Sequence, residues 1–478
     1  MFTWKGAVYS VEKYNKVSIF IILFATFLFA FTQFLLINAY PTIMREFNVN
    51  NSQIQLLTSL FLFTTMILIP FTNYLSDTFK SNHLIIAALF LLILGTFLGC
   101  QSFNFYMLLI SRIIQGAGYA IILPISQSVL LKIAPNKHQS FVLGLLNSVI
   151  NIAPAIAPPI TGIFLAFLNW KIMYWLLLPF EILVVIISIL YLSNTFENKK
   201  TKLNKKIVTL YAMGCIFLSL MLLFLDLNII FSLLSGFISL LIFAIFIFLD
   251  KRSKVSLINF NLLHSQIIQL PTIALFLVMM LLLSVESILP IFTQSILNYT
   301  PIESGFIMTP GTLILILATF ISSQLFDKNQ NSNIIIIGVI TTAISLVLFI
   351  FIDMHSYMFT TIIVFCLFMF GIGCTITPLT SIAYINLDAA YLFQGSALIN
   401  TFRQFGLILG VTLFSKIINF ISHLSVYHST TSNLLLGIRI SYIAMALILV
   451  IVLKLALSLK KLQNKISLSD TNHSNIKL

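Results

Sequence analysis

Apolar residues form long, nearly unbroken runs along this chain, and short polar segments separate them. A helix needs roughly 20 apolar residues to cross a bilayer core about 30 Å thick. The pattern therefore predicts an all-α polytopic membrane protein with fourteen transmembrane helices. The predicted spans are 17–40, 53–74, 83–100, 104–131, 139–168, 172–194, 207–226, 229–249, 271–295, 304–325, 333–352, 357–385, 393–420 and 436–458.

Two basic loops divide these spans into groups. SNTFENKKTKLNKK follows the sixth span, and DKRSK follows the eighth. Six spans on either side of an inserted pair are typical of a transporter built from two related bundles. We expect an N-terminal bundle at 1–194, a basic cytoplasmic loop at 195–206, an inserted helix pair at 207–249, a cytoplasmic linker at 250–270, a C-terminal bundle at 271–458 and a cytoplasmic tail at 459–478.

The distribution of charge gives this arrangement a direction. Only 8% of the residues are charged, against about 25% in soluble domains, and 26 Lys and Arg face 13 Asp and Glu. The basic residues gather in every second loop, as the positive-inside rule expects of cytoplasmic loops. We therefore predict a multi-pass protein of the plasma membrane with both termini in the cytoplasm. This topology accounts for the positive charge without a nucleic-acid partner.

Sequence patterns of catalysis and metal binding are missing. The four cysteines stand singly in apolar runs, without metal-ligand spacing. The sequence contains no nucleotide-binding glycine motif, no HExxH and no Ser/His/Asp set with recognisable spacing. We expect neither enzymatic activity nor a cofactor.

An arginine stands inside the fourth predicted span, in SRIIQGAGYA. A charge at the bilayer centre costs at least about 2.5 kcal/mol, which makes a lipid-facing position for Arg112 implausible. Gln115 follows one turn later on the same face, and Gly116 and Gly118 would let a neighbouring helix approach closely. Arg112 either braces the bundle through backbone carbonyls and Gln115, or faces a central cavity and communicates with a proton-binding carboxylate.

Three carboxylates lie within or at the edge of predicted spans: Glu181, Asp226 and Glu286. A carboxyl group in apolar surroundings binds a proton more readily than one in water, as proton coupling requires. Glu286, in LLLSVESILPIF, is the favoured candidate because its neighbours are apolar. Glu181 follows, and Asp226 comes last because it lies at the outer edge of its span. For each of them a purely structural hydrogen bond is the alternative.

Two further segments carry residues suited to conformational change. The fifth predicted span reads NSVINIAPAIAPPITG and contains Pro154 and Pro158. Prolines remove backbone hydrogen bonds and bend a membrane helix, so the bend is either a rocking interface or a fixed kink. Asp77, in the loop NYLSDTFKSNH, is either a latch on the cytoplasmic side or an ordinary solvated acid.

Several of these segments resemble motifs of the major facilitator superfamily. RIIQGAGYA is similar to the helix-four motif RxxQGxGxA, NYLSDTFKS to the loop motif GxLxDRxGR, and APAIAPPITG to the antiporter motif of helix five. Three later segments resemble the fourteen-helix drug:proton antiporter branch. They are NWKIMYWLLLP, LPIFTQSILNYTPIESGFIMTPG and FQGSALINTFRQFGLILG.

The resemblance implies a major facilitator fold of two six-helix bundles plus the inserted pair. It also implies a proton-coupled exporter of lipophilic or cationic drugs that works by alternating access, with the proton gradient as its energy source. Its partners would be small substrates, protons and the bilayer, and we expect a monomer. The resemblance assigns conformational roles to Asp77, Lys80, Gly116, Gly118, Pro154, Ala157, Pro158, Gly162, Arg403, Gly406 and Gly410.

The sequence departs from the family pattern in helix one. FTQFLLINAYP lacks the acid that many relatives carry there, and offers Gln33 and Asn38 instead. With Gln115, these two are the candidate cavity residues, while Glu286, Glu181, Arg112 and Asp226 are the candidates for proton coupling. The alternatives are an exporter of one endogenous metabolite or lipid-like compound, a proton-independent facilitator, an import permease, and a non-transporting scaffold or enzyme.

Overall fold

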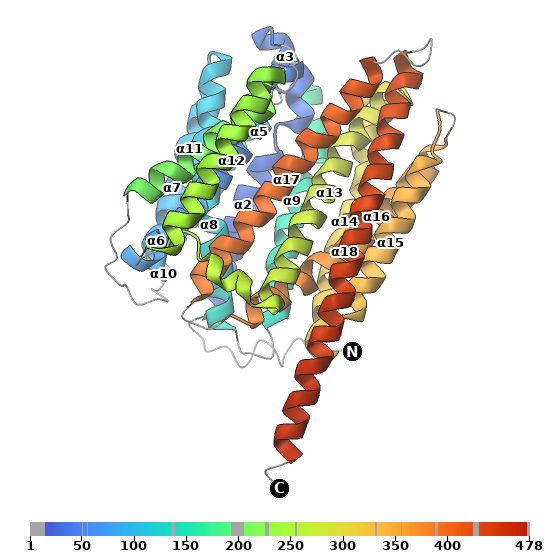
Figure 1. The fold of residues 1–478 in the computed structure, drawn as a ribbon. Helices are drawn as coiled ribbons and strands as arrows, with labels where there is room; N and C mark the ends of the chain where they lie inside the picture. Colours follow the sequence, from blue (N-terminus) through green and yellow to red (C-terminus); the bar gives the residue numbers. More distant parts are fainter. Residues whose placement is uncertain are drawn as a thin grey trace.

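The computed structural model is a bundle of long helices (Figure 1). The residues that it describes contain no strand. They are 15–49, 51–54, 56–134, 139–192, 205–224, 229–253, 256–329, 332–354, 356–387, 391–423 and 430–475.

The first half of the chain, α2 to α10, contains two interruptions that the apolar runs do not reveal. Pro70, which has no backbone N–H to donate, separates α5 from α6, and Asn48, with a left-handed φ of 52°, ends α3. The elements are α2 (Asn15–Phe34), η1 (Ile37–Ala39), α3 (Tyr40–Phe47), α4 (Asn51–Ile54), α5 (Leu56–Leu68), α6 (Phe71–Thr78), α7 (Ser81–Cys100), α8 (Phe105–Ile133), α9 (Gln139–Phe167) and α10 (Lys171–Tyr191).

An inserted pair and the second half follow. The inserted pair is α11 (Lys205–Phe224) and α12 (Ile229–Lys251), and η3 (Phe260–His264) lies in the linker. The second half comprises α13 (Gln266–Ser295), α14 (Pro301–Asn329), α15 (Asn333–Ile350), α16 (Met358–Ile385), α17 (Leu392–His423) and α18 (Thr430–Asn475).

Eleven of the described helices are long and apolar enough to cross a membrane. The second, fifth and seventh predicted spans contain shorter described apolar segments, Leu56–Leu68, Phe141–Pro154 and Lys206–Met221. One predicted limit was wrong, because the first span ends at Phe34, before a separate helix α3. Helix α18 continues beyond the last predicted span to Asn475 and projects beyond the other helices (Figure 1).

Each half has its own hydrophobic core. One cluster joins buried residues of α2 to α12 and includes Leu398 and Ile408 from α17. The other joins buried residues of α13 to α18 and includes Leu131 and Leu143 from α8 and α9. The halves therefore meet where α17, α8 and α9 cross from one cluster to the other.

The inserted pair contacts both halves. Tyr211 of α11 donates its hydroxyl to the carbonyl oxygen of Met66, 2.9 Å away, in the first half. Phe243 of α12 packs edge-on against Phe405 of α17, with 6.1 Å between the ring centroids. These contacts attach α11 and α12 to both halves of the bundle.

Several polar and aromatic contacts between the halves lie toward one end of the bundle. The end of α8, the start of α9 and the end of α14 meet there, and the charge pattern predicts that this end faces the cytoplasm. We call it the cytoplasmic end. Ser148 of α9 lies 3.0 Å from Thr319 of α14 between their hydroxyl oxygens, and Phe141 packs edge-on against Phe320 at 5.6 Å.

Candidate functional site

Arg112 of α8 is fully buried, and backbone carbonyls surround it. Its Nη1 and Nη2 donate to the carbonyl oxygens of Thr32 and Gln33, at 2.8 and 2.9 Å, and Nε donates to that of Leu57 at 3.3 Å. The carbonyls of Thr32 and Gln33 lack intrahelical partners because α2 ends at Phe34. The guanidinium therefore caps the negative end of α2. With no exposed surface, it faces no open cavity in this conformation.

A hydrogen-bonded chain leads from Arg112 to a carboxylate. Arg112 Nη1 donates to Gln115 Oε1 at 3.0 Å, Gln115 Nε2 to Thr96 Oγ1 at 3.3 Å, and Thr96 Oγ1 to Glu181 Oε1 at 2.9 Å. The chain crosses α8, α7 and α10. It connects the predicted arginine to one of the predicted acids through a threonine that the sequence did not single out, although Gly95–Thr96 interrupts an apolar span.

Glu181 is fully buried, and its Oε2 has no hydrogen-bond partner. An ionised carboxylate with a bare oxygen in an apolar interior is costly. The single bond from Thr96 therefore suits a carboxyl group that carries a proton in this conformation. A group of this kind can exchange a proton when a change of packing admits water.

Close backbone contacts surround this chain. A Cβ on Gly116 would lie 2.6 Å from the carbonyl oxygen of Phe61, so α8 and α5 touch there only because residue 116 has no side chain. A Cβ on Gly118 would meet the Phe29 ring at 2.7 Å. In the second half, Gly406 and Gly410 of α17 lie against the backbone of α13, at Phe276 and Met280.

Glu286 of α13 is half-buried, and none of the described residues hydrogen-bonds to it. Leu283, one turn before it, packs against the hydrophobic cluster of the first half. Residues three apart share a helix face, so Glu286 lies on the side of α13 that looks toward the first half. The two favoured acids therefore belong to opposite halves.

A polar cluster joins the halves nearer the cytoplasmic end. Gln127 of α8 accepts a hydrogen bond from the hydroxyl of Tyr384 of α16 at 2.5 Å, and another from Asn400 Nδ2 of α17. Ser396 Oγ donates to the carbonyl oxygen of Pro124 at 3.0 Å. The sequence patterns did not single out Gln127 or Tyr384. The sequence sign of this cluster is the pair Ser396 and Asn400, two polar residues four apart in α17.

Arg403 lies one turn beyond Asn400 on α17. It is half-buried, and its Nη1 is buried without a hydrogen-bond partner. Its guanidinium lies near Tyr384 of the second half and Tyr119 of α8. The family resemblance gave Arg403 a conformational role, and the structure places it at the junction of the halves.

Two acids stand at the cytoplasmic end. Asp77 lies half-buried in α6, which packs against α17, and Lys80 is an exposed residue at the start of α7. Asp327, at the end of α14, accepts a hydrogen bond at 2.7 Å from the backbone N–H of Phe141, in the first turn of α9. An acid at a helix N-terminus is favourable, and this one links the halves. Sequence reasoning missed Asp327, although SQLFDKN repeats the spacing of NYLSDTF.

Helix α9 runs without a break through its prolines. Pro154 is half-buried, Ala157 is fully buried, and Thr161 donates to the carbonyl oxygen of Leu35 at 3.0 Å. The helix packs against α2 on one side and α14 on the other. Asp226 and the side-chain positions of Asn38, Pro158 and Gly162 lie outside the described residues.

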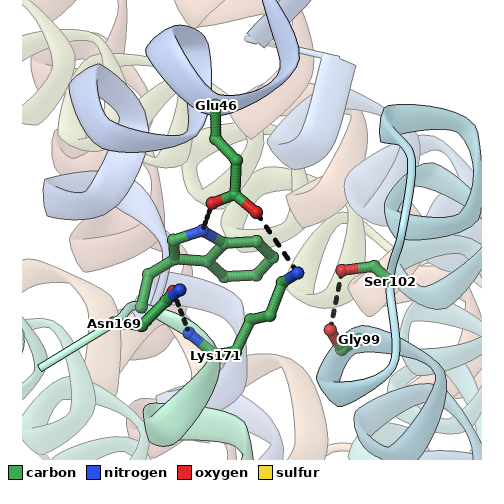
Figure 2. Close-up of polar contacts among 6 residues, drawn as sticks. Glu46, Gly99, Ser102, Asn169 and Lys171 are labelled. Atoms are coloured by element: carbon green, nitrogen blue, oxygen red, sulfur yellow. Dashed lines mark hydrogen bonds and ion pairs between the residues drawn. The ribbon is translucent and has the colours of Figure 1, made fainter.

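A separate polar clamp lies at the opposite end of the bundle (Figure 2). Glu46 Oε2 accepts a hydrogen bond from Trp170 Nε1 at 2.5 Å, and its Oε1 lies 3.2 Å from Lys171 Nζ. Asn169 Oδ1 accepts the backbone N–H of Lys171 at 3.2 Å (Figure 2). The clamp ties α3 to the first turn of α10. Within the described ranges, no group of three His, Cys, Asp or Glu side chains is placed to hold a metal ion.

Comparison with known proteins places this geometry in context. The model of the Major Facilitator Superfamily matches residues 22–411. The MFS-type transporter YcnB of Bacillus subtilis is 30% identical over 94% of this chain and 96% of its own length. The lincomycin resistance protein LmrB of the same organism is 27% identical over 88% and 89%. The solved human organic anion transporter MFSD10 covers 92% of this chain and 99% of its own, with a TM-score of 0.68 at 11% identity, and shows the same fold.

Proposed function

Because this chain belongs to the major facilitator superfamily of transporters, we propose that it is a proton-coupled exporter of small lipophilic or cationic molecules that works by alternating access in the plasma membrane. The observation that carries the proposal is the buried chain from Arg112 to Glu181, which ends in a carboxyl oxygen without a partner. The likeness to the lincomycin resistance protein LmrB supports export of small molecules.

The contacts between the halves support an outward-facing state. Gln127 bonds to Tyr384, Ser148 to Thr319, and Asp327 to the backbone of Phe141, all toward the cytoplasmic end. Closure of that end is the arrangement expected of an outward-facing transporter. Rocking about α9 and α14 would break these bonds and open the cytoplasmic side instead.

The two acids take different parts in this cycle. Glu286, half-buried and facing the other half, exchanges its proton with water that enters from outside. Glu181, buried beside Thr96, receives or releases a proton when the packing of α7, α8 and α10 changes. Arg112 holds the end of α2, and α2 packs against α9. Gain or loss of a proton at Glu181 changes the hydrogen-bonded chain to Arg112 and thereby the position of α2. Asp226 remains a further candidate.

Proton movement in proteoliposomes tests the proposal. Addition of lincomycin or ethidium to liposomes that hold the purified protein should displace protons, and a pH-sensitive dye reports this. Glu286→Gln or Glu181→Gln should abolish the proton signal in protein that elutes as a single species. The matched control is Glu303→Gln, whose exposed carboxylate bonds only to Thr300. Drug uptake without proton movement in the wild type would overturn the coupling.

A further inference from the structure

We propose that Arg403 is a substrate-binding residue that takes an oxyanion, a carboxylate or phosphate group, carried by part of the exported molecules. The inference rests on the proposed export function and narrows its substrate class. Neither the sequence motifs nor the relatives assign a ligand to this side chain.

The position of Arg403 calls for an explanation. It lies eleven residues along α17 from Leu392, which at 1.5 Å per residue is about 16 Å into a core of about 30 Å. A charged side chain at such a depth is costly. Membrane proteins retain one where it pairs with another group or serves a substrate or ion pathway.

Arg403 has no acidic partner and no acceptor in the described part of the chain. The ion pairs of Lys171 with Glu46 and of Arg439 with Asp353 lie elsewhere, and no described residue accepts a hydrogen bond from Arg403. Its Nη1 is buried with its donors unused. Arg112 provides the contrast, since carbonyls and Gln115 accept four hydrogen bonds from that guanidinium.

The surroundings of Arg403 suit an acceptor-rich ligand. Tyr119 and Tyr384 are the polar side chains near it. The Tyr384 hydroxyl already donates to Gln127, whereas Tyr119 is buried between the rings of Phe29 and Phe61. A guanidinium presents five N–H donors in a planar fork that matches a carboxylate or phosphate. The unused N–H donors of Arg403 lie in apolar surroundings. They therefore favour a lipophilic ligand that carries an anionic oxygen group.

Arg403 is less buried than the cluster beside it. Arg403 keeps part of its surface exposed, while Tyr384, Ser396 and Asn400 are buried at 1% exposure or less. Arg403 therefore lies at the junction of the halves, next to the bonds that close the cytoplasmic end. When α8 and α17 separate, its guanidinium becomes reachable from the cytoplasm. A substrate site at such a junction changes its access as the halves move, as alternating access requires.

A pair of probes that differ only in one charge tests the inference. Dansylphenylalanine and its carboxamide share their size and apolar groups, and dansyl fluorescence reports their binding to the purified full-length protein. We expect the carboxylate to bind at least about tenfold more tightly, because a hydrogen bond to a charged group is stronger than one between neutral groups. Equal affinities for the two probes in the wild type would overturn the inference.

Variants identify the residue responsible. Arg403→Gln should bring the affinity ratio close to one, and Arg403→Lys should bring it to between one and the wild-type value, because lysine keeps the charge but loses the planar fork. Arg439→Gln, at an exposed ion pair far along the chain, is the matched control and should keep the wild-type ratio. A wild-type ratio in Arg403→Gln, or in Arg403→Lys should the first variant not fold, would contradict the assignment.

The two proposals fail separately. Proton-coupled movement of ethidium, which carries no acidic group, does not depend on an oxyanion site and should persist in Arg403→Gln. Loss of the carboxylate preference with intact ethidium transport would be the expected result. Ethidium transport without proton coupling would instead reject the proposed function. The ratio of the two dansyl probes' affinities would still decide the role of Arg403.

Discussion

Two arginines of this protein illustrate how little residue type alone decides. Arg112 and Arg403 both lie inside membrane helices, yet one donates to carbonyls at the end of α2 and to Gln115, and the other keeps a buried nitrogen without a partner. The first stabilises a helix junction. The second has the properties of a binding group.

Removal of the first arginine should destabilise the fold. Arg112→Ala would leave the carbonyls of Thr32 and Gln33 without donors, and each unsatisfied buried acceptor costs about 1–3 kcal/mol. We expect a loss of at least about 2 kcal/mol, which thermal melts in detergent would record as a fall of several degrees. Arg45→Ala, on the exposed face of α3, is the control. An unchanged melting temperature for Arg112→Ala would show that the carbonyls find other donors.

At the scale of elements, short helices and caps set the ends of the bundle. Helix α3 lies outside the predicted first span and is held to α10 by Glu46, Trp170 and Lys171 (Figure 2). The ion pair is partly exposed, with 27% and 33% of the two side chains accessible, whereas Trp170 is fully buried. We therefore expect the buried Trp170 side chain to stabilise the clamp more than the partly exposed ion pair does.

Single substitutions in the clamp should separate these contributions. Lys171→Ala should cost less than about 1 kcal/mol, because exposed ion pairs are weak. Trp170→Ala should cost about 3–5 kcal/mol, as large aromatic truncations do, with a corresponding drop in melting temperature. Equal effects of the two substitutions would contradict this and show that the ion pair contributes as much as the indole.

At the scale of the whole molecule, the two halves meet through α9 with α14 and through α8 with α17. Polar bonds close the cytoplasmic end, and two of their partners carry an atom left without a hydrogen bond, Gln127 Nε2 and Asn400 Oδ1. Such atoms make the closed interface less favourable than a fully satisfied one. The interface is therefore suited to opening within a transport cycle.

Cross-linking tests whether this interface must open. With the four native cysteines replaced, Ser148→Cys together with Thr319→Cys should form a disulfide, since the two hydroxyl oxygens lie 3.0 Å apart. Oxidation should then stop transport, and a reductant should restore it. Each single cysteine variant serves as the control. Full transport by the oxidised double variant would exclude opening between α9 and α14.

The sequence by itself determined the helical membrane class, because bilayer thickness fixes the length of an apolar run that can cross it. It also determined that Arg112 and Gln115 meet, because residues three apart share a helix face. It did not determine the limits of α2 or α18, since apolar runs do not mark where a helix ends outside the membrane. Helix α2 ends early because a junction leads to α3, and α18 continues as a polar helix beyond its apolar run.

Only the tertiary structure decided which distant residues make the candidate site. Arg112 reaches Glu181 through Thr96, Asp327 caps α9, and Arg403 stands unpaired beside Tyr119 and Tyr384. Each of these relations joins helices far apart in the sequence. Hydropathy records how much of a helix is apolar but not which neighbour it faces, so it cannot tell a satisfied buried charge from an unsatisfied one. Whether a buried charge finds a partner depends on which helices pack around it.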